Sequence, residues 1–274
     1  MSRTFPFSQK APPVVLIFAA SDPVSGAGAQ ADMLTLAALG CHPATAITAL
    51  TVQDTIGVHD LAPVAAEQVA AQARAVLADL PVAVFKFGVL GSAKNAHAAA
   101  DIAEKYPEIP LVLDPVLASG RGDALADEAL IDVLRTRLLP RAALITPNTP
   151  EARRLSACAT EDLAQIAARL LALGARHVLL TGTHAAAKGP VCNHLYDASG
   201  LLEKTDWARL PGSFHGSGCT LAAACAAHLA HGKDMLAATR AAQEFTWQSL
   251  AHAFAPGKGQ RIPDRFWRQK HVAA

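Results

Sequence analysis

The sequence predicts an α/β fold in which a mostly parallel sheet is covered by helices on both faces. Short unbroken apolar runs, such as residues 14–20, are typical of strands buried on both sides. These runs alternate along the chain with longer stretches of helical length. No linker, repeat or low-complexity tract divides the 274 residues, so we expect one domain over 1–274, with 1–12 as a flexible N-terminal extension.

The first half of the chain contains the clearest alternation of strands and helices. The strand at 14–20 leads into the loop 21–28, and a helix over 29–39 ends at Gly40, which can act as its C-terminal cap. A strand at 44–50 precedes a helix over 63–80, where Pro63 suits the first turn. The next expected elements are strands at 82–87, 111–113 and 142–145 and helices at 93–106 and 126–138.

The second half ends in two helices. A helix over 160–173 is expected because Thr160 can cap its start and Gly174 its end. A strand at 178–180 is followed by a hairpin whose strands cover 191–196 and 201–207. The final helices are expected over 219–231 and 234–254, with Gly232 between them.

Composition excludes several classes of protein. The formal net charge is +1 and only 5% of the residues are aromatic, so neither a basic patch nor a base-stacking platform for nucleic acid is expected. No apolar run reaches the ~18 residues of a membrane helix. The five cysteines lack the spacing of a disulfide framework or a zinc site, which favours a reducing cytoplasm.

Polar residues follow five of the predicted strands. In parallel sheets, ligands bind beyond the carboxyl ends of the strands. The residues at these places are Asp22 with the Ser25–Gly28 loop, Gln53, Asp114, Asn148 with Glu151, and Thr181 with Gly182. Each also has a structural interpretation. The loop is not a complete nucleotide fingerprint, Asp114 could terminate a strand, and Asn148 and Glu151 have the spacing of a helix-capping pair.

The run Gly212–Thr220 is the most informative motif. Gly216, Ser217 and Gly218 lead directly into an alanine-rich helix. Glycines allow backbone N–H groups to approach a ligand, and the start of a helix carries partial positive charge, so this turn predicts an anion site. Cys219 lies in the first turn, where a thiolate would be stabilised, although a lone cysteine is more often a buried apolar residue. The combination indicates phosphoryl transfer.

These motifs together resemble a known family. The segments are ASDP (20–23), SGAGAQAD (25–32), ITALTVQDTIGV (47–58), KFGVLGS (86–92), LDPV (113–116), LITPNTPEA (144–152) and HGSGCTLAAA (215–224). Their order and spacing resemble the ribokinase-like superfamily and, within it, the hydroxymethylpyrimidine/phosphomethylpyrimidine kinases of thiamine biosynthesis. Val89 departs from a frequent methionine, and Thr181 from a lysine found in many relatives.

The resemblance implies a ribokinase-like three-layer α/β/α sandwich and an ATP- and Mg²⁺-dependent kinase. It would phosphorylate 4-amino-5-hydroxymethyl-2-methylpyrimidine and then its monophosphate. The implied acceptor site is Ala20, Asp32, Gln53, Val89 and Val116, and the implied catalytic group is Cys219 with Gly216, Ser217 and Gly218. The implied nucleotide site is Asp114, Asn148, Thr181 and Gly182, with Glu151 and Asp114 at the metal. Lys258, in the glycine-flanked segment 257–259, could reach a nucleotide phosphate or equally belong to a solvated tail.

Two alternative functions stay open at this point. A pyridoxal or pyridoxine kinase has the same frame, and its acceptor is also a hydroxymethyl group on an aromatic nitrogen ring. A nonenzymatic nucleotide sensor would bind ATP without transferring phosphate. The resemblance further suggests a cytoplasmic homodimer whose partners are small molecules, not nucleic acid or membrane.

Overall fold

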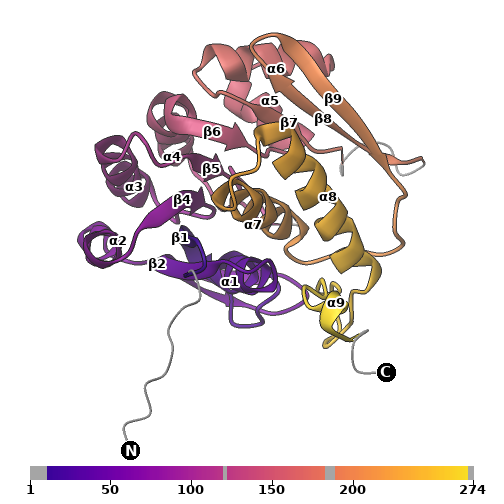
Figure 1. Cartoon of the computed structure of the whole chain (residues 1–274), viewed down its shortest axis with the longest axis horizontal. Helices are drawn as coiled ribbons and strands as arrows, with labels where there is room; N and C mark the ends of the chain where they lie inside the picture. Colours follow the sequence, from indigo (N-terminus) through magenta and orange to yellow (C-terminus); the bar gives the residue numbers. More distant parts are fainter. Residues whose placement is uncertain (1–10, 120–121, 183–188, 271–274) are drawn as a thin grey trace, which may run out of the picture.

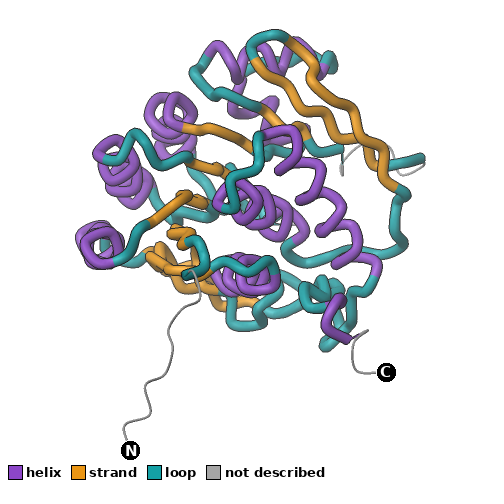
Figure 2. The backbone as a smooth tube through the Cα atoms, in the orientation of Figure 1, coloured by secondary structure: helices purple, strands orange, loops and turns teal. Residues whose placement is uncertain are grey.

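The computed structural model describes residues 11–119, 122–182 and 189–270, which form three layers (Figures 1 and 2). The N-terminal extension expected over 1–12 lies outside these residues except for its last two. Nine strands in the described ranges pair into one sheet, in the order β3-β2-β1-β4-β5-β6-β7-β8-β9. The fold is therefore the α/β sandwich that the alternating pattern predicted.

The sheet is mostly parallel. Its strands are β1 (Val14–Ser21), β2 (His42–Gln53), β3 (Val58–Pro63), β4 (Val82–Phe87), β5 (Leu111–Leu113), β6 (Ala142–Ile145), β7 (Val178–Leu180), β8 (Val191–Asp197) and β9 (Gly200–Trp207). The strands from β2 to β7 in the sheet order pair in parallel, while β3 at one edge and β8 and β9 at the other pair antiparallel. The carboxyl ends of the parallel strands consequently meet at one edge.

Helices cover both faces of the sheet. They are α1 (Gly28–Ala38), α2 (Ala66–Asp79), α3 (Ala93–Lys105), α4 (Glu128–Val133), α5 (Thr149–Ser156), α6 (Leu163–Ala172), α7 (Ser217–Ala230), α8 (Met235–Ala251) and α9 (Trp267–Lys270). One apolar core joins β1 to α1, α7 and α8 through Val15 and Ile17. The other joins β1 to α2–α6 through Leu16 and Phe18. Because neighbouring strand residues point to opposite faces, an unbroken apolar strand fills both cores.

Three expected elements differ from the sequence-based prediction. Pro63 ends the edge strand β3 instead of starting a helix, and α2 begins only at Ala66. The helix after Thr160 is capped by Asp162, whose carboxylate accepts hydrogen bonds from two backbone N–H groups. The expected helix 126–138 is α-helical only over Glu128–Val133 and continues as a π-helical turn. The first two differences arise at helix starts, where several capping or turn residues lie close together and the sequence did not rank them.

The packing of the central aromatic residues predicts the cost of a core mutation. Phe87 is fully buried, and its ring centroid lies 4.5 Å from that of Phe18. Phe87→Ala would leave a cavity in the larger core and is expected to lower the free energy of unfolding by about 3–5 kcal/mol. Urea denaturation measures this change. The exposed control Leu201→Ala should stay within about 0.5 kcal/mol of the native chain, and equal losses would contradict the packing argument.

Candidate active site

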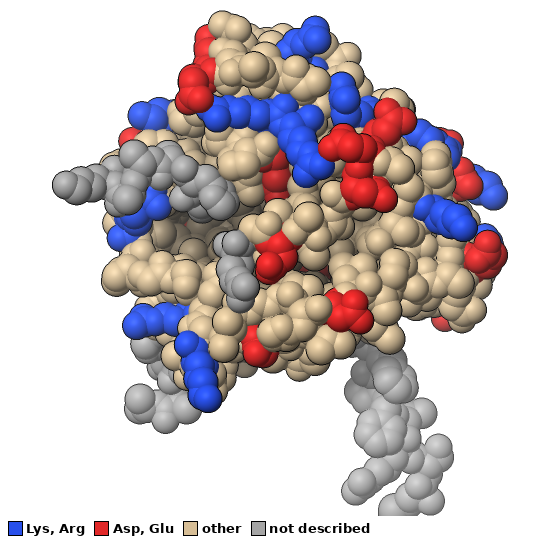
Figure 3. All heavy atoms as spheres, turned by 180° about the vertical axis from the view of Figure 1, so that it is seen from behind, with Lys and Arg blue, Asp and Glu red and all other residues tan. Residues whose placement is uncertain are grey.

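A cavity of about 440 Å³ lies at the carboxyl edge of the parallel strands. Its lining comes from the ends of β1, β2, β5, β6 and β7, from the first turn of α7, and from α8. The surface seen from behind is hollowed, and most of the atoms around the hollow belong to uncharged residues (Figure 3). The polar residues expected at the strand ends are therefore largely brought together.

The loop after β1 is organised by Asp22. This carboxylate is fully buried, accepts hydrogen bonds from the backbone N–H groups of Val24 and Ala27, and lies 2.9 Å from His215 Nε2. Burial alone would raise the pKa of Asp22, but the hydrogen bonds from His215, Ala27 and Val24 outweigh it and hold the pKa below its ordinary value. Asp22 thus joins the first glycine loop to the turn before α7.

The two glycine loops approach each other backbone to backbone. Gly216 has φ +79°, and a Cβ at this position would overlap the carbonyl oxygen of Gly26. A Cβ at Gly26 would overlap the ring of His215 in turn. Neither position has space for a side chain, so both require glycine. At Gly216 the positive φ favours glycine as well. This contact sets the start of α7 against the loop after β1.

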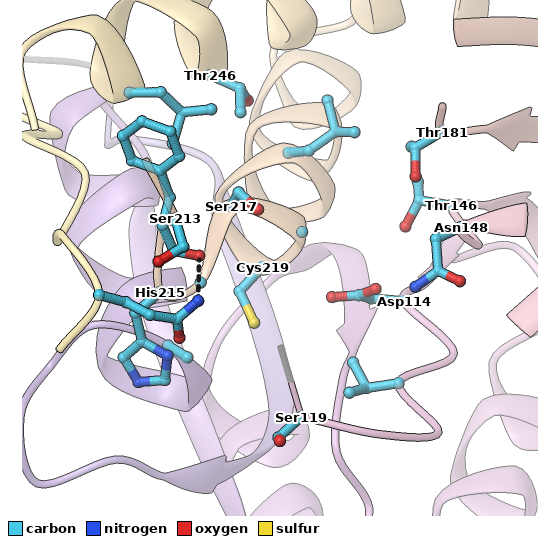
Figure 4. A pocket seen from close by; sticks show the side chains of 18 of the residues that line it. Asp114, Ser119, Thr146, Asn148, Thr181, Ser213, His215, Ser217, Cys219 and Thr246 are labelled. Atoms are coloured by element: carbon cyan, nitrogen blue, oxygen red, sulfur yellow. Dashed lines mark hydrogen bonds between the residues drawn. The ribbon is translucent and has the colours of Figure 1, made fainter. Parts of the chain in front are cut away.

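Cys219 lies in the first turn of α7, and its side chain extends into the pocket (Figure 4). Gly216, Ser217 and Gly218 line the same pocket, and their role as an anion site stays a prediction. The expectation of a stabilised thiolate is not met. Burial raises the pKa of Cys219, Lys86 opposes this, and Asp114 and Asp32 raise it further. The helix N-terminus does not overcome these effects, so the thiol is neutral at pH 7.

A buried ion pair lies beside the catalytic turn. Lys86 Nζ donates to Asp32 Oδ2 over 2.7 Å and is 3.9 Å from Asp114 Oδ2, and the Lys86 and Asp32 side chains are fully buried. Burial raises the pKa of Asp32, and the Lys86 charge counteracts this. Asp32 does not line the cavity, so the expected contact with an acceptor does not fit this geometry. The sequence signal that could have found the pair is the lysine of the segment KFGVLGS, a charge inside an apolar strand.

Asn148 and Glu151 form the capping box that their spacing allowed. Asn148 Oδ1 accepts from the Glu151 N–H, and Glu151 Oε2 accepts from the Asn148 N–H, each over 2.9 Å. Both residues also line the cavity with Asp114. Burial raises the pKa of Glu151 to about 8, the Asp114 charge raises it too, and the backbone N–H groups counteract both effects. The capping and functional interpretations are therefore compatible.

The acceptor residues that reach the cavity are Ala20, Gln53, Val89 and Val116. Gln53 is the last residue of β2, and its Nε2 lies 2.6 Å from Thr51 Oγ1, which donates to the carbonyl oxygen of Ser21 over 2.8 Å. This chain of hydrogen bonds fixes the Gln53 amide beside the end of β1. Thr51 was not expected here, since a threonine in a strand carries no distinctive signal.

The opposite end of the cavity is lined by Thr181 and by residues that sequence reasoning missed. Asn193 Nδ2 and Trp207 Nε1 both donate to Gln243 Oε1, over 3.0 and 3.1 Å. The Gly182 N–H donates to Asn193 Oδ1, so Gly182 supports this network but does not line the cavity. Lys258, also expected at the nucleotide, is exposed and lies outside the lining. The network joins strands to a distant helix, which no local motif reveals.

Comparisons with known proteins agree with this architecture. The family model for phosphomethylpyrimidine kinase matches residues 22–264. A hydroxymethylpyrimidine/phosphomethylpyrimidine kinase of Mycobacterium tuberculosis is 42% identical over 253 residues, covering 90% of this chain and 92% of that protein. The thiamine biosynthesis bifunctional protein ThiED of Geobacter sulfurreducens is 39% identical over 248 residues, covering 89% of this chain and 50% of that protein. The pyridoxal kinase from Staphylococcus aureus, solved with pyridoxal, superposes with a TM-score of 0.87 at 27% identity, covering 95% of this chain and 96% of that one.

The fold is that of the ribokinase-like kinases, and the matched family makes the chain a kinase, a phosphotransferase. The chain belongs to the phosphomethylpyrimidine kinase family, because the family model covers most of its length and its sequence is 42% identical to that of the M. tuberculosis protein.

Two findings concern the described residues alone. They contain no group of three or more His, Cys, Asp or Glu side chains arranged to hold a metal ion. None of their helices is both long enough and apolar enough to cross a lipid bilayer.

The buried Asp22 carboxylate predicts a pH-dependent contribution to stability. Because its folded pKa lies below the unfolded value of about 3.9, ionised Asp22 stabilises the fold above about pH 4, and this contribution disappears as pH falls through the folded pKa. Asp22→Asn should therefore lower the free energy of unfolding by about 1–3 kcal/mol near neutral pH, with a smaller difference near pH 3.

Urea denaturation across this pH range measures the effect, with the exposed Asp132→Asn as control. If Asp22→Asn lowered the free energy of unfolding equally at acidic and neutral pH, the stabilising role of ionised Asp22 would be contradicted.

Proposed function

We propose that this chain transfers the γ-phosphoryl group of ATP to 4-amino-5-hydroxymethyl-2-methylpyrimidine and then to its monophosphate, in thiamine biosynthesis. The observation that carries the proposal is the turn Gly216–Cys219, whose amides and thiol border the same cavity as Asp114. Phosphoryl transfer needs positioning and charge stabilisation more than covalent chemistry by the protein. Amides at the start of α7 supply that stabilisation where negative charge develops.

The acceptor lies, in this proposal, at the Gln53 end of the cavity. An amide can donate to a ring nitrogen and accept from the neighbouring amino group, which suits an aminopyrimidine. Ala20, Val89 and Val116 supply apolar contact with the ring. The names of the Mycobacterium and Geobacter relatives support this acceptor. Pyridoxal remains the competing acceptor, because the S. aureus pyridoxal kinase has the same fold.

The nucleotide lies towards Thr181, Asn148 and the Gln243 network. Asp114 and Glu151 are the residues that fit Mg²⁺, since Asp114 Oδ2 is buried without a hydrogen-bond partner and both carboxyls face one cavity. Magnesium typically uses one or two carboxylates together with substrate phosphates, and it would neutralise phosphate charge when bound. With the metal present, Asp114 and Glu151 would bind as carboxylates, while the amides of α7 hold the opposite side of the phosphates.

Cys219 has a different role in the two steps. A free hydroxymethyl group carries a proton that must leave, and we assign its removal to the thiolate form of Cys219. The monophosphate is already largely ionised near neutral pH, because its second pKa is about 6. The second step therefore needs the amides of the turn but little proton transfer.

A coupled kinase assay on three acceptors tests the proposed function. The acceptors are the pyrimidine alcohol, its monophosphate and pyridoxine, each with ATP and Mg²⁺. The proposal predicts that kcat/KM for the pyrimidine alcohol exceeds that for pyridoxine by at least about tenfold, which corresponds to roughly 1.4 kcal/mol. Faster turnover of pyridoxine would make the chain a pyridoxine kinase, and ATP binding without transfer would identify a sensor.

Replacement of the thiol should separate the two steps. Cys219→Ala is expected to lower kcat for the alcohol by about 10²-fold or more, the usual contribution of a general base, and kcat for the monophosphate by less than about tenfold. Single-turnover rates with each acceptor give both values. Cys225→Ala is the matched control, because Cys225 is buried in the same helix but lies outside the cavity. This variant should change kcat for neither acceptor. Equal losses in both steps would contradict the assignment.

The neutral thiol predicts an alkaline rise in the first step. Because the pKa of Cys219 is raised, its thiolate fraction near pH 7 is small and increases about tenfold per pH unit below that pKa. The kcat/KM for the alcohol should rise from about pH 7 to 9, while that for the ionised monophosphate stays nearly level. A plateau for the alcohol already at neutral pH would contradict a raised pKa.

We also propose a cytoplasmic homodimer. The five cysteines are free, as a reducing compartment favours. Exposed Leu50 and Val52 on β2 and Ile56 in the following turn make an apolar surface suited to a second copy.

A further inference from the structure

The segment 254–266 contacts two parts of the site that are distant from it in the sequence. Arg261 exchanges backbone hydrogen bonds with Ser213 and His215, over 3.0 and 2.9 Å. Gln260 N–H donates to the carbonyl oxygen of Thr55 over 2.7 Å, in the turn that follows Gln53. The segment therefore contacts both the acceptor end and the turn before α7.

The side chain of Arg265, in the buried stretch 262–265 of this segment, lies in the interior. It is 3% exposed and does not line the cavity. Its Nη2 donates to the carbonyl oxygen of Gly26 over 2.7 Å and to Thr220 Oγ1 over 3.0 Å. Its Nε donates to Thr220 Oγ1 over 3.2 Å, and its Nη1 to the carbonyl oxygen of Ser25 over 3.4 Å. One guanidinium thus bridges the first glycine loop and the first turn of α7.

The partners of Arg265 are dipoles and not charges. Within the described ranges, no carboxylate lies within ion-pair distance of its guanidinium. Burial lowers the pKa of Arg265 to about 10, with Cys219, Asp32 and Asp22 acting in the opposite direction, so the group stays charged near pH 7. A buried cation with no carboxylate in direct contact is costly unless a closer anion is supplied. The neighbouring helix start is the place where a phosphate would supply one.

The local backbone needs the support that Arg265 gives. Ser25 has φ +58°, a left-handed conformation that non-glycine residues rarely adopt. Thr220 Oγ1, which accepts from Arg265, donates to the carbonyl oxygen of Gly216 over 2.8 Å. Arg265 therefore acts on both sides of the Gly26–Gly216 contact, through Ser25 and Gly26 on one side and Thr220 on the other.

We propose that Arg265 is a positioning residue for phosphoryl transfer, which holds the two glycine loops at the spacing of the transferring phosphoryl group and adds its positive charge to the start of α7. The proposal rests on the proposed function for the identity of the acceptor. It does not require Arg265 to touch ATP or the acceptor. Its effect is consequently larger on the transition state than on ground-state binding.

Two variants test this role. Arg265→Ala removes the bridge and the charge, and is expected to lower kcat by about 30-fold or more with KM for ATP within about threefold. Thr220→Val keeps the shape of its side chain but cannot accept from Arg265, and should lower kcat by about threefold to tenfold. In the double variant the losses should be less than multiplicative, because both changes break one connection. Millimolar guanidinium should restore part of the kcat of Arg265→Ala.

Arg268→Ala is the matched control. Arg268 is exposed, lies three residues further on, and stacks on Trp267 with its guanidinium carbon 5.1 Å from the ring centroid. This variant should keep the native kcat. Thermal unfolding of every variant, together with kcat per folded molecule, separates positioning from stability. If Arg265→Ala does not fold, Thr220→Val tests the positioning role of Arg265. Its kcat should fall while its KM for ATP stays near the native value.

A second readout does not depend on the acceptor. Binding of ADP–Mg²⁺ with aluminium fluoride, an analogue of the transferring phosphoryl group, is compared with binding of ADP–Mg²⁺ alone. Arg265→Ala should weaken the first by about tenfold or more and the second by less than about threefold. This result would stand even if the native chain failed to phosphorylate the pyrimidine, an outcome that would reject only the proposed function. Native kcat and native fluoride-complex affinity in Arg265→Ala, or lost stability alone, would overturn the role of Arg265.

Discussion

The close contact between the loop after β1 and the turn before α7 is the constraint on which the rest of the site depends. Gly216 packs on the Gly26 carbonyl group with no space for a side chain. This contact fixes where the first amides of α7 point, and it places Cys219 in the cavity. The Asp22–His215 pair and the Arg265 bridge both act across it. These three interactions join segments that are distant in the sequence. Together they fix the distance between the loop after β1 and the start of α7.

Groups of both charge signs surround this contact. The start of α7 and Arg265 contribute positive charge, the Asp114 carboxyl lies beside Gly218 in the first turn of α7, and Glu151, whose pKa is raised to about 8, becomes a carboxylate when a cation binds. Such an arrangement suits a phosphate chain carrying its own cation, because each partner meets the opposite charge in a poorly solvated place. Lys86, which is paired with Asp32, lies 3.9 Å from Asp114 Oδ2 and compensates part of the carboxylate charge.

The sequence predicted the fold and most of the strand-end residues that line the cavity, because both depend on local patterns. Apolar runs defined β4, β5, β6 and β7 to the residue, and strand ends marked Asp114, Asn148 and Thr181. The family resemblance pointed to Gln53, which lines the cavity, and to Asp32, which does not; Lys258, which was named from its neighbouring glycines, also lies outside the lining. Arg265 and Gln243 act through contacts between residues far apart in the chain, which no spacing rule encodes. The protonation of Cys219 depends on desolvation, which a motif cannot report.

The most direct test of the account is a comparison of two glycines at the two ends of α7. Gly216 and Gly232 both have positive φ, +79° and +82°, but only a Cβ at Gly216 would overlap another part of the chain. Both alanine variants carry a conformational cost of about 1 kcal/mol, so the difference between them isolates the loop contact. We predict that Gly216→Ala, measured as folded protein, loses about 10²-fold or more in kcat while Gly232→Ala stays near native. A folded Gly216→Ala enzyme with native kcat would contradict the central role of this contact.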